Sequence, residues 1–284
     1  MMPAMTDLPL IVTAFYDIGR GQWQHYQRSS DRYFDCFERL CLLKNDIVVF
    51  SQPQFRERFE AIQRRRANLT VIYDDIFAKH ATLLGRIRRV QQDPAFRAGI
   101  GPIESPEYNS AEYVLVNYLK SEFCCLAIEG NGHGQVAWVD FGYLRKPRQV
   151  PRSRRWQSPW PVGIHFFGLR SLAEPIDLLK TIQTNTVYIQ GCHLVAHRND
   201  WPLIRDGMAA AMEELLARHW VDDDQTLLLM LALKHPDLVT VHPNQPDARL
   251  GWFNLFRRFN AAEADASLLD RISLQFVLLA QRLR

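Results

Sequence analysis

Short apolar runs alternate with segments of helical periodicity near the start of the chain. The runs Leu8–Phe15, Ile47–Phe50 and Leu69–Tyr73 have the length and composition of buried strands. Between them, Ser29–Leu43 and Phe55–Arg66 carry apolar residues at helical spacing. A β-α-β-α-β order with short loops is typical of a parallel sheet covered by helices. The sequence therefore predicts an α/β fold.

The rest of the chain extends this pattern. A further strand ends just before Asp140, and the proline- and arginine-rich segment 146–160 has no periodicity, so we expect a loop there. Loops are also expected over 94–107, strands over 164–169, 186–189 and 238–241, and helices over 76–90, 112–127, 200–219, 222–234 and 267–283. We expect one domain over residues 1–260, followed by an amphipathic C-terminal helix within 261–284.

Composition limits the class of protein. The chain has 284 residues, 47% of them hydrophobic, which is enough to bury a sizeable core. Its net charge of +3 is too small to indicate a nucleic-acid partner. The five cysteines are odd in number and lack zinc-ligand spacing, which favours a reducing compartment. Residues 1–10 do not resemble a signal peptide, and no apolar run approaches the roughly 18 residues of a membrane span. We expect a cytoplasmic protein.

Asp140 is the first candidate for chemistry. It follows the apolar run Val136–Val139 and precedes a glycine, Gly142. A strand that delivers a carboxylate to the carboxyl edge of an open sheet can present a metal ligand there, and hard divalent cations prefer carboxylate oxygens. The alternative is a solvated Asp in a turn. The second acid of an Asp-x-Asp pattern is replaced by Gly142.

The first strand is followed by a loop with two glycines. In parallel sheets the nucleotide commonly binds at this position. Arg20 could then contact a phosphate and Asp17 the ribose or the base, or the two could form a surface ion pair. No G-x-G-x-x-G or Walker-type motif is present, which argues against a dehydrogenase or a P-loop NTPase.

Lys120 and the acidic run Asp222–Asp224 form the next candidates. Lys120 could neutralise a diphosphate leaving group, or it could be an exposed helical lysine. The acidic run suits a helix N-terminus, and Asp222 with Gln225 matches a capping box. In the functional interpretation, Asp223 or Asp224 acts as general base on an acceptor hydroxyl, or binds the acceptor.

A glycine, several histidines and a basic run complete the candidates. Gly191 would let the backbone approach a sugar closely. His193, His197 and His242 are candidates for acceptor contacts or metal ligands, although a lone histidine is more often structural. The basic run could bind acceptor phosphates or an anionic membrane surface, or be a solvated loop; it contains Arg145, Lys146, Arg148, Arg152, Arg154 and Arg155.

Three motifs together resemble the bacterial HtrL/YibB family: Val12–Arg20, Trp138–Tyr143 and Asp223–Gln225. Its members are often encoded among lipopolysaccharide or surface-polysaccharide genes. The resemblance implies a GT-A-like single α/β domain with a central mixed, mainly parallel sheet, and a glycosyltransferase activity. It covers residues 8–256.

The resemblance also implies roles for individual residues. Asp140 would hold Mn²⁺ or Mg²⁺, with His242 completing the metal shell. Asp224, with Asp223 beside it, would lie on the acceptor side. The nucleotide-sugar site would contain Thr13, Phe15, Arg20, Lys120, Asp140 and, on the acceptor side, Gly191. Asp74, which ends the third strand, is added to this site from its position in the sequence alone.

The main hypothesis is a metal-assisted transfer from a nucleotide-diphosphate sugar to a lipid-linked or lipopolysaccharide glycan. If the reaction inverts the anomeric configuration, Asp224 is the natural base; if it retains it, Asp224 positions the sugar. A basic surface would suit a peripheral contact with the inner membrane.

Two alternatives remain. The first is a phosphohydrolase using Asp74 or Asp140, although the Asp-x-Asp-x-Thr arrangement of a common class is missing. The second is a non-catalytic polysaccharide-assembly partner that docks through the C-terminal helix. The same helical stripe is also typical of core packing or a homodimer contact; it contains Leu268, Leu269, Ile272, Phe276, Leu279 and Leu283.

Overall fold

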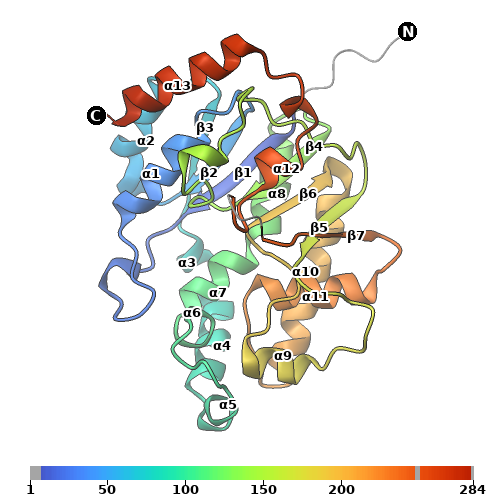
Figure 1. Ribbon diagram of the computed structural model, residues 1–284. Helices are drawn as coiled ribbons and strands as arrows, with labels where there is room; N and C mark the ends of the chain where they lie inside the picture. Colours follow the sequence, from blue (N-terminus) through green and yellow to red (C-terminus); the bar gives the residue numbers. More distant parts are fainter. Residues whose placement is uncertain (1–7, 247–249, 283–284) are drawn as a thin grey trace.

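A central sheet organises the protein, whose computed structural model describes residues 8–246 and 250–282 (Figure 1). Within these residues seven strands follow the order β3-β2-β1-β4-β6-β5-β7. Strand β6 runs antiparallel to β4 and β5, and the other neighbouring strands are parallel. The predicted single α/β domain with a mixed, mainly parallel sheet is confirmed. The strands are β1 Leu10–Phe15, β2 Ile47–Ser51, β3 Leu69–Tyr73, β4 Gln135–Val139, β5 Ile164–Gly168, β6 His193–His197 and β7 Val239–Pro243.

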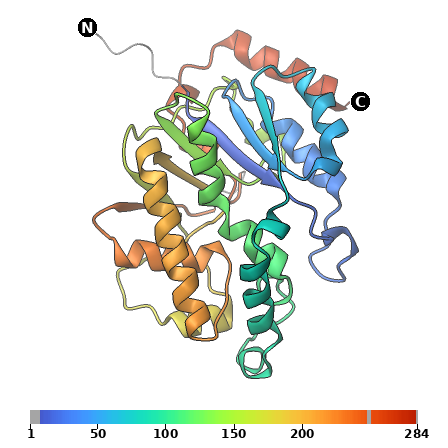
Figure 2. The ribbon, with the colours of Figure 1, turned by 180° about the vertical axis from the view of Figure 1, so that it is seen from behind.

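Helices cover both faces of the sheet. Figure 2 shows α8 and α10 in front of one face, and Figure 1 shows α1, α2, α12 and α13 on the other. The helices are α1 Ser30–Leu40, α2 Arg56–Gln63, α3 Ile76–Lys79, α4 Ala81–Gln92, α5 Pro94–Ala98, α6 Pro106–Asn109, α7 Ala111–Tyr118, α8 Lys120–Glu129, α9 Leu178–Thr184, α10 Trp201–Ala217, α11 Asp224–Lys234, α12 Leu255–Arg258 and α13 Leu268–Arg282.

Strand β1 explains why its sequence is apolar without interruption. Val12 and Ala14 pack into the core beneath α8 and α10, whereas Ile11 and Phe15 pack into the core on the α1 side. Successive side chains of a strand point to opposite faces, so a strand buried on both faces is apolar at every position. The two faces thus form two separate hydrophobic cores.

One predicted strand is wrong. Residues 186–189 form no ladder, and only Ile189 makes an isolated bridge with Gly168. The actual strand, β6, starts a few residues later and pairs with both β4 and β5. It begins and ends with histidines, His193 and His197, which hide its apolar centre from a search for apolar runs.

Three other segments differ in detail. The helices expected over 76–90 and 112–127 are each interrupted, at His80 and at Leu119. The expected loop over 94–107 contains the short helices α5 and α6. The interruption at Leu119 matters for the site, because it makes Lys120 the first residue of α8.

The basic segment 146–160 is an irregular loop anchored by a buried tryptophan. Trp156 is fully buried; its indole Nε1 donates to the Phe259 carbonyl, and its backbone N–H donates to Asn45 Oδ1. Asn45 in turn donates to the Pro9 and Trp156 carbonyls. The loop is therefore held firmly against the rest of the domain.

The C-terminal helix α13 rests on the sheet through one side only. Leu274 is buried in the core that contains α1, with Val277 and Leu278 packed against it. The opposite side exposes Leu268, Leu269, Ile272, Phe276 and Leu279, while Leu283 lies outside the described residues. Among the described residues no helix is long and apolar enough to cross a bilayer.

The strand order creates a switch point between β1 and β4. From β1 the chain adds β2 and β3 on one side and then returns to add β4 on the other. In open α/β sheets, ligands bind in the crevice outside the carboxyl ends of the strands at such a point. The fold therefore places a binding site where β1 and β4 end.

Candidate functional site

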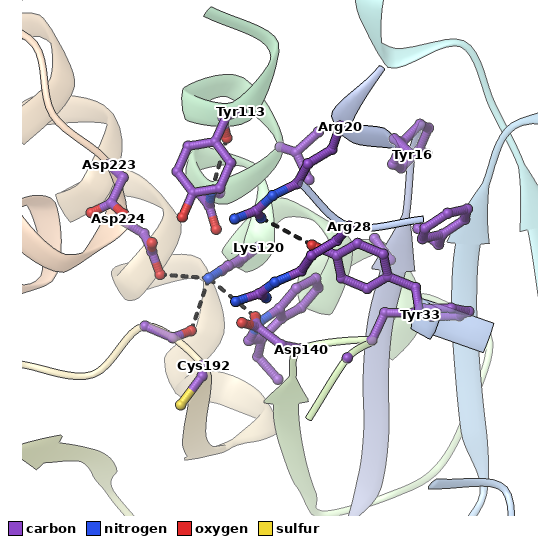
Figure 3. Close-up of a pocket in the computed structure, with 18 of the residues that line it drawn as sticks. Tyr16, Arg20, Arg28, Tyr33, Tyr113, Lys120, Asp140, Cys192, Asp223 and Asp224 are labelled. Atoms are coloured by element: carbon purple, nitrogen blue, oxygen red, sulfur yellow. Dashed lines mark hydrogen bonds and ion pairs between the residues drawn. The ribbon is translucent and has the colours of Figure 1, made fainter. Parts of the chain in front are cut away.

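A pocket of about 360 Å³ lies at this switch point (Figure 3). Asp17 follows β1 and Asp140 follows β4, so the two ends of the crevice each contribute a carboxylate. Helices α7, α8 and α11 and the segment entering β6 form one part of its wall, and the start of α1 with the segments around Arg145 and Phe253 forms another. The pocket thus combines segments that lie far apart in the sequence.

Lys120 lies at the centre of the pocket floor, with 2% of its surface exposed. Its Nζ lies 2.7 Å from Asp224 Oδ2, 2.9 Å from the Gly191 carbonyl oxygen and 3.2 Å from Asp140 Oδ1 (Figure 3). Burial lowers its pKa, but the charges of Asp140 and Asp224 outweigh burial and raise it above the ordinary value. Lys120 is therefore a buried cation held by two carboxylates.

Asp140 is held from two sides. The indole Nε1 of Trp138 donates to Asp140 Oδ1 at 2.9 Å, and the same oxygen faces Lys120. Its backbone N–H donates to the Cys192 carbonyl, because antiparallel β6 begins where β4 ends. With 38% of its side chain exposed, Asp140 still faces the pocket. The predicted place of Asp140 at the strand end is confirmed.

Gly191 has a steric role. A Cβ at this position would lie 1.9 Å from Asp224 Oδ2. This distance is too short for two non-bonded atoms, so no residue with a side chain fits here. Only a glycine lets the carboxylate of Asp224 pack against this backbone while its carbonyl accepts from Lys120.

Arginines form the side of the pocket that lies opposite to α11 and its acidic residues. Arg20 donates to the Tyr26 carbonyl and to the Tyr33 hydroxyl, and the guanidinium of Arg145 lies 4.0 Å over the Phe253 ring. Desolvation, and then the nearby charge of Arg28, lower the pKa of Arg145. Among the described residues no carboxylate lies within 4 Å of the guanidinium nitrogens of these arginines. Their charges are free to bind an anion.

Buried acids form the wall around α11. Asp223 caps the helix by accepting from the Gln225 N–H, and Asp222 accepts from the Thr226 hydroxyl. Burial, followed by the charges of Asp224, Glu107 and Asp222, raises the pKa of Asp223 well above its ordinary value. A carboxylate with a raised pKa is a stronger base than a free one. Asp223 lines the pocket and has no ion pair among the described residues.

Three residues expected in the site lie elsewhere. Thr13 is fully buried within β1, two residues before the rim, and does not line the pocket. Asp74 follows β3, two strands from β1, and pairs with Lys79 at 2.8 Å. His242 lies on β7, which three strand spacings, roughly 14 Å, separate from β4. Phe15 reaches the pocket rim but mainly packs, stacked on Phe141.

The expected metal ligands do not fit a divalent ion as placed. His242 forms a hydrogen bond with His165 and stacks on Trp160, away from Asp140. A Cβ at Gly142 would lie 3.0 Å from Tyr33 Cδ1, so Tyr33 would have to move for a second acid. Within the residues that the structure describes, no group of three His, Cys, Asp or Glu residues could hold a metal.

Sequence reasoning missed Arg28 and Tyr113 as pocket residues and did not single out Arg145 from its basic run. Arg145 had a usable signal, because it follows the strand-end Asp140 by five positions. Arg28 had none, since it only precedes the Ser29 cap of α1. The buried acid Glu107 also lay unnoticed in a segment expected to be a loop.

These features define an α/β protein with a polar pocket, lined by arginines and buried carboxylates, at the carboxyl edge of its sheet. The chain belongs to the HtrL/YibB family: residues 8–261 match its profile, described as "Bacterial protein of unknown function (HtrL_YibB)". It is 33% identical over 273 residues to Protein HtrL of Escherichia coli (strain K12), covering 91% of this chain and 94% of that protein.

The chain also shows similarity to solved structures. Mouse xyloside xylosyltransferase 1 matches with a TM-score of 0.42 and 12% identity, covering 89% of this chain and 93% of that one. The glycosyltransferase GlyE of Streptococcus pneumoniae TIGR4 matches with a TM-score of 0.41 and 12% identity, covering 85% of this chain and 46% of that one.

The contact between Gly191 and Asp224 can be tested by Gly191→Ala. The new methyl would displace the Asp224 carboxylate and break its buried pair with Lys120. We expect the free energy of unfolding to fall by about 3–5 kcal/mol, as for other broken buried pairs. Urea denaturation measures it. Gly134→Ala is the matched control, because a Cβ there meets nothing within 4 Å. Equal effects of the two substitutions would contradict the steric role.

Proposed function

We propose that this protein is a glycosyltransferase that moves a sugar from a nucleotide-diphosphate donor to a bacterial surface glycan such as lipopolysaccharide. One observation carries the proposal: at the switch point of the sheet, arginines without carboxylate partners face buried carboxylates across one pocket. The first set suits a phosphate-bearing leaving group, and the second suits the acid–base chemistry of a hydroxyl. Mn²⁺ or Mg²⁺ is left out of the proposal, because the two expected ligands, Asp140 and His242, do not lie together.

The positions of the arginines indicate which end of the pocket binds the donor. Arg20, Arg28 and Arg145 surround the ends of β1 and β4, where Tyr33 and Phe253 add aromatic surface. A planar guanidinium binds phosphate oxygens with two parallel hydrogen bonds, and aromatic rings pack against bases and sugars. A nucleoside diphosphate would thus lie along this side.

The positions of the buried acids indicate which end of the pocket binds the acceptor. In the proposed step an acceptor hydroxyl oxygen attacks the anomeric carbon, and the bond from that carbon to the diphosphate oxygen breaks. The hydroxyl proton passes to Asp223, and the negative charge left on the diphosphate is met by Arg28 and Arg145. Asp223 is favoured over Asp224 as the base, because Asp224 already accepts from Lys120. Asp224 is then a positioning residue.

The C-terminal helix supports a peripheral contact with the inner membrane. Its exposed side carries Leu268, Leu269, Ile272, Phe276 and Leu279, and Leu279 also lines a groove together with Arg148, Arg152, Arg257 and Arg271. Apolar side chains beside arginines are typical of helices that lie in the interface of an anionic bilayer. We place the enzyme in the cytoplasm, a compartment that suits its five free cysteines.

The donor end predicts nucleotide binding. A thermal-shift screen with UDP, GDP, CMP, ADP and their sugar conjugates should give a rise in melting temperature with one nucleotide class. Arg145→Ala should weaken that nucleotide by about 1.5–3 kcal/mol, roughly ten- to a hundredfold, because a charge-assisted contact is lost. Arg148→Ala, in the same loop but on the α13 groove, should bind normally.

Two results would contradict this function. Stabilisation by no nucleotide would favour a non-catalytic assembly partner. Phosphate release from simple phosphoesters without a sugar acceptor would favour the phosphohydrolase alternative.

The acceptor end predicts a separation of binding from chemistry. Asp223→Asn should bind the nucleotide found in the screen with unchanged affinity, because Asp223 lies across the pocket from the arginines. Transfer, followed as release of nucleoside diphosphate from its sugar conjugate, should slow by about 10²–10⁴-fold through loss of the general base. Gln225→Glu, also at the start of α11, serves as a control for charge placed beside this site. Unchanged turnover by Asp223→Asn would remove its role as base.

The helix α13 predicts binding to anionic vesicles. The protein should sediment with phosphatidylglycerol vesicles, less so at high salt, and little with phosphatidylcholine alone. Phe276→Glu should abolish sedimentation, whereas Val162→Glu should not, although the two side chains are equally exposed at 68% and 67%. A dimer in size-exclusion chromatography that Phe276→Glu dissociates, without vesicle binding, would assign the stripe to a homodimer contact instead.

A further inference from the structure

The three oxygen atoms around Lys120 Nζ form the coordination shell of a cation. Asp224 Oδ2, the Gly191 carbonyl oxygen and Asp140 Oδ1 lie at 2.7, 2.9 and 3.2 Å from it (Figure 3). Carboxylate and carbonyl oxygens are the ligands that hard divalent cations prefer. The shell thus has the chemistry of a metal site, but an ammonium fills it.

Protein groups surround the ammonium of Lys120. Two of its three N–H donors go to Asp224 Oδ2 and to the Gly191 carbonyl oxygen, and Asp140 Oδ1 forms an ion pair with it. In this arrangement the charge of Lys120 is taken up by protein carboxylates, whereas from the sequence we expected it to neutralise a diphosphate. Its positive charge instead fixes Asp140 and Asp224 and compensates their charges inside the protein.

Other groups carry the charge that a metal would supply. Arg28 and Arg145 are close enough for the charge of one to lower the pKa of the other, after desolvation of Arg145. Neither has an ion-pair partner among the described residues. Two neighbouring guanidinium groups without an ion-pair partner among the described residues suit the two charged groups of a diphosphate.

We infer that Lys120 is a built-in replacement for the divalent cation, and that the protein binds its nucleoside diphosphate without metal. This inference rests on the proposed function, since it concerns the same pocket and the same leaving group. In this arrangement the ammonium of Lys120 compensates the protein carboxylates, and arginines compensate the phosphates. Mn²⁺ or Mg²⁺, which we expected from the sequence, is then not required.

The inference makes an unusual prediction for Lys120→Ala. Removing the ammonium leaves two carboxylates and a carbonyl oxygen around a space that a small cation can enter. The variant should gain a rise in melting temperature with Mn²⁺ that the wild type lacks. Adding Asp140→Asn to the variant should remove that gain. Lys79→Ala is the matched control, because it also frees a carboxylate, Asp74, but outside the pocket.

The first experiment measures nucleoside diphosphate affinity of the wild type in EDTA and in Mn²⁺, using UDP, GDP, CDP and ADP. Equal affinities within about twofold would support the inference. Binding at least about tenfold tighter in Mn²⁺, a difference of ~1.4 kcal/mol, would overturn it and leave the proposed transferase standing. Binding of none of the four in either condition would overturn both. These measurements on the wild type test metal independence even if Lys120→Ala fails to fold.

If Lys120→Ala folds, its response to Mn²⁺ provides an independent measurement. A gain confined to this variant supports the ammonium as the occupant of a cation position. A response to Mn²⁺ that is equal in the wild type would show that the metal binds elsewhere in the pocket, and would overturn metal independence.

Discussion

The Lys120 ammonium joins parts of the fold that are distant in sequence. It connects the start of α8 with the end of β4 through Asp140, with α11 through Asp224, and with the entry of β6 through Gly191. Desolvating these charges is costly, and removing one partner leaves the others uncompensated in the interior. Each member of this cluster therefore contributes to holding the shape of the pocket. The floor of the pocket is thus built from mutually compensating buried charges and not from apolar side chains.

The cluster also separates the two ends of the pocket. With Lys120 compensating Asp140 and Asp224, the pocket side near Arg28 and Arg145 keeps an excess of positive charge, while Asp223 stays among acids. An anionic leaving group and a hydroxyl that must lose a proton need opposite surroundings. In the proposed transferase, the fixed ammonium would allow both surroundings within one small cavity.

The local pattern was sufficient for the first half of the sheet, because β1, β2 and β3 are buried runs between clear helices. It also located Asp140, whose strand ends in a polar turn. It could not place Thr13, which is buried within β1 before the rim of the pocket, or His242, whose distance from the pocket depends on strand order. Nor could it find Arg28, which has no neighbouring motif. For His242, the missing information was the pairing of distant strands, which only the folded chain defines.

The reversed direction of β6 has the largest consequence for the site. In a parallel sheet the residues entering a strand lie at the edge opposite to the ligand crevice. Because β6 runs antiparallel to β4, its first residues lie beside Asp140, and the Cys192 carbonyl accepts from the Asp140 N–H. The Gly191 carbonyl thereby becomes available to Lys120. A parallel β6 would remove one of the three oxygens of the ammonium shell, so the antiparallel strand is what completes a cation position without a metal.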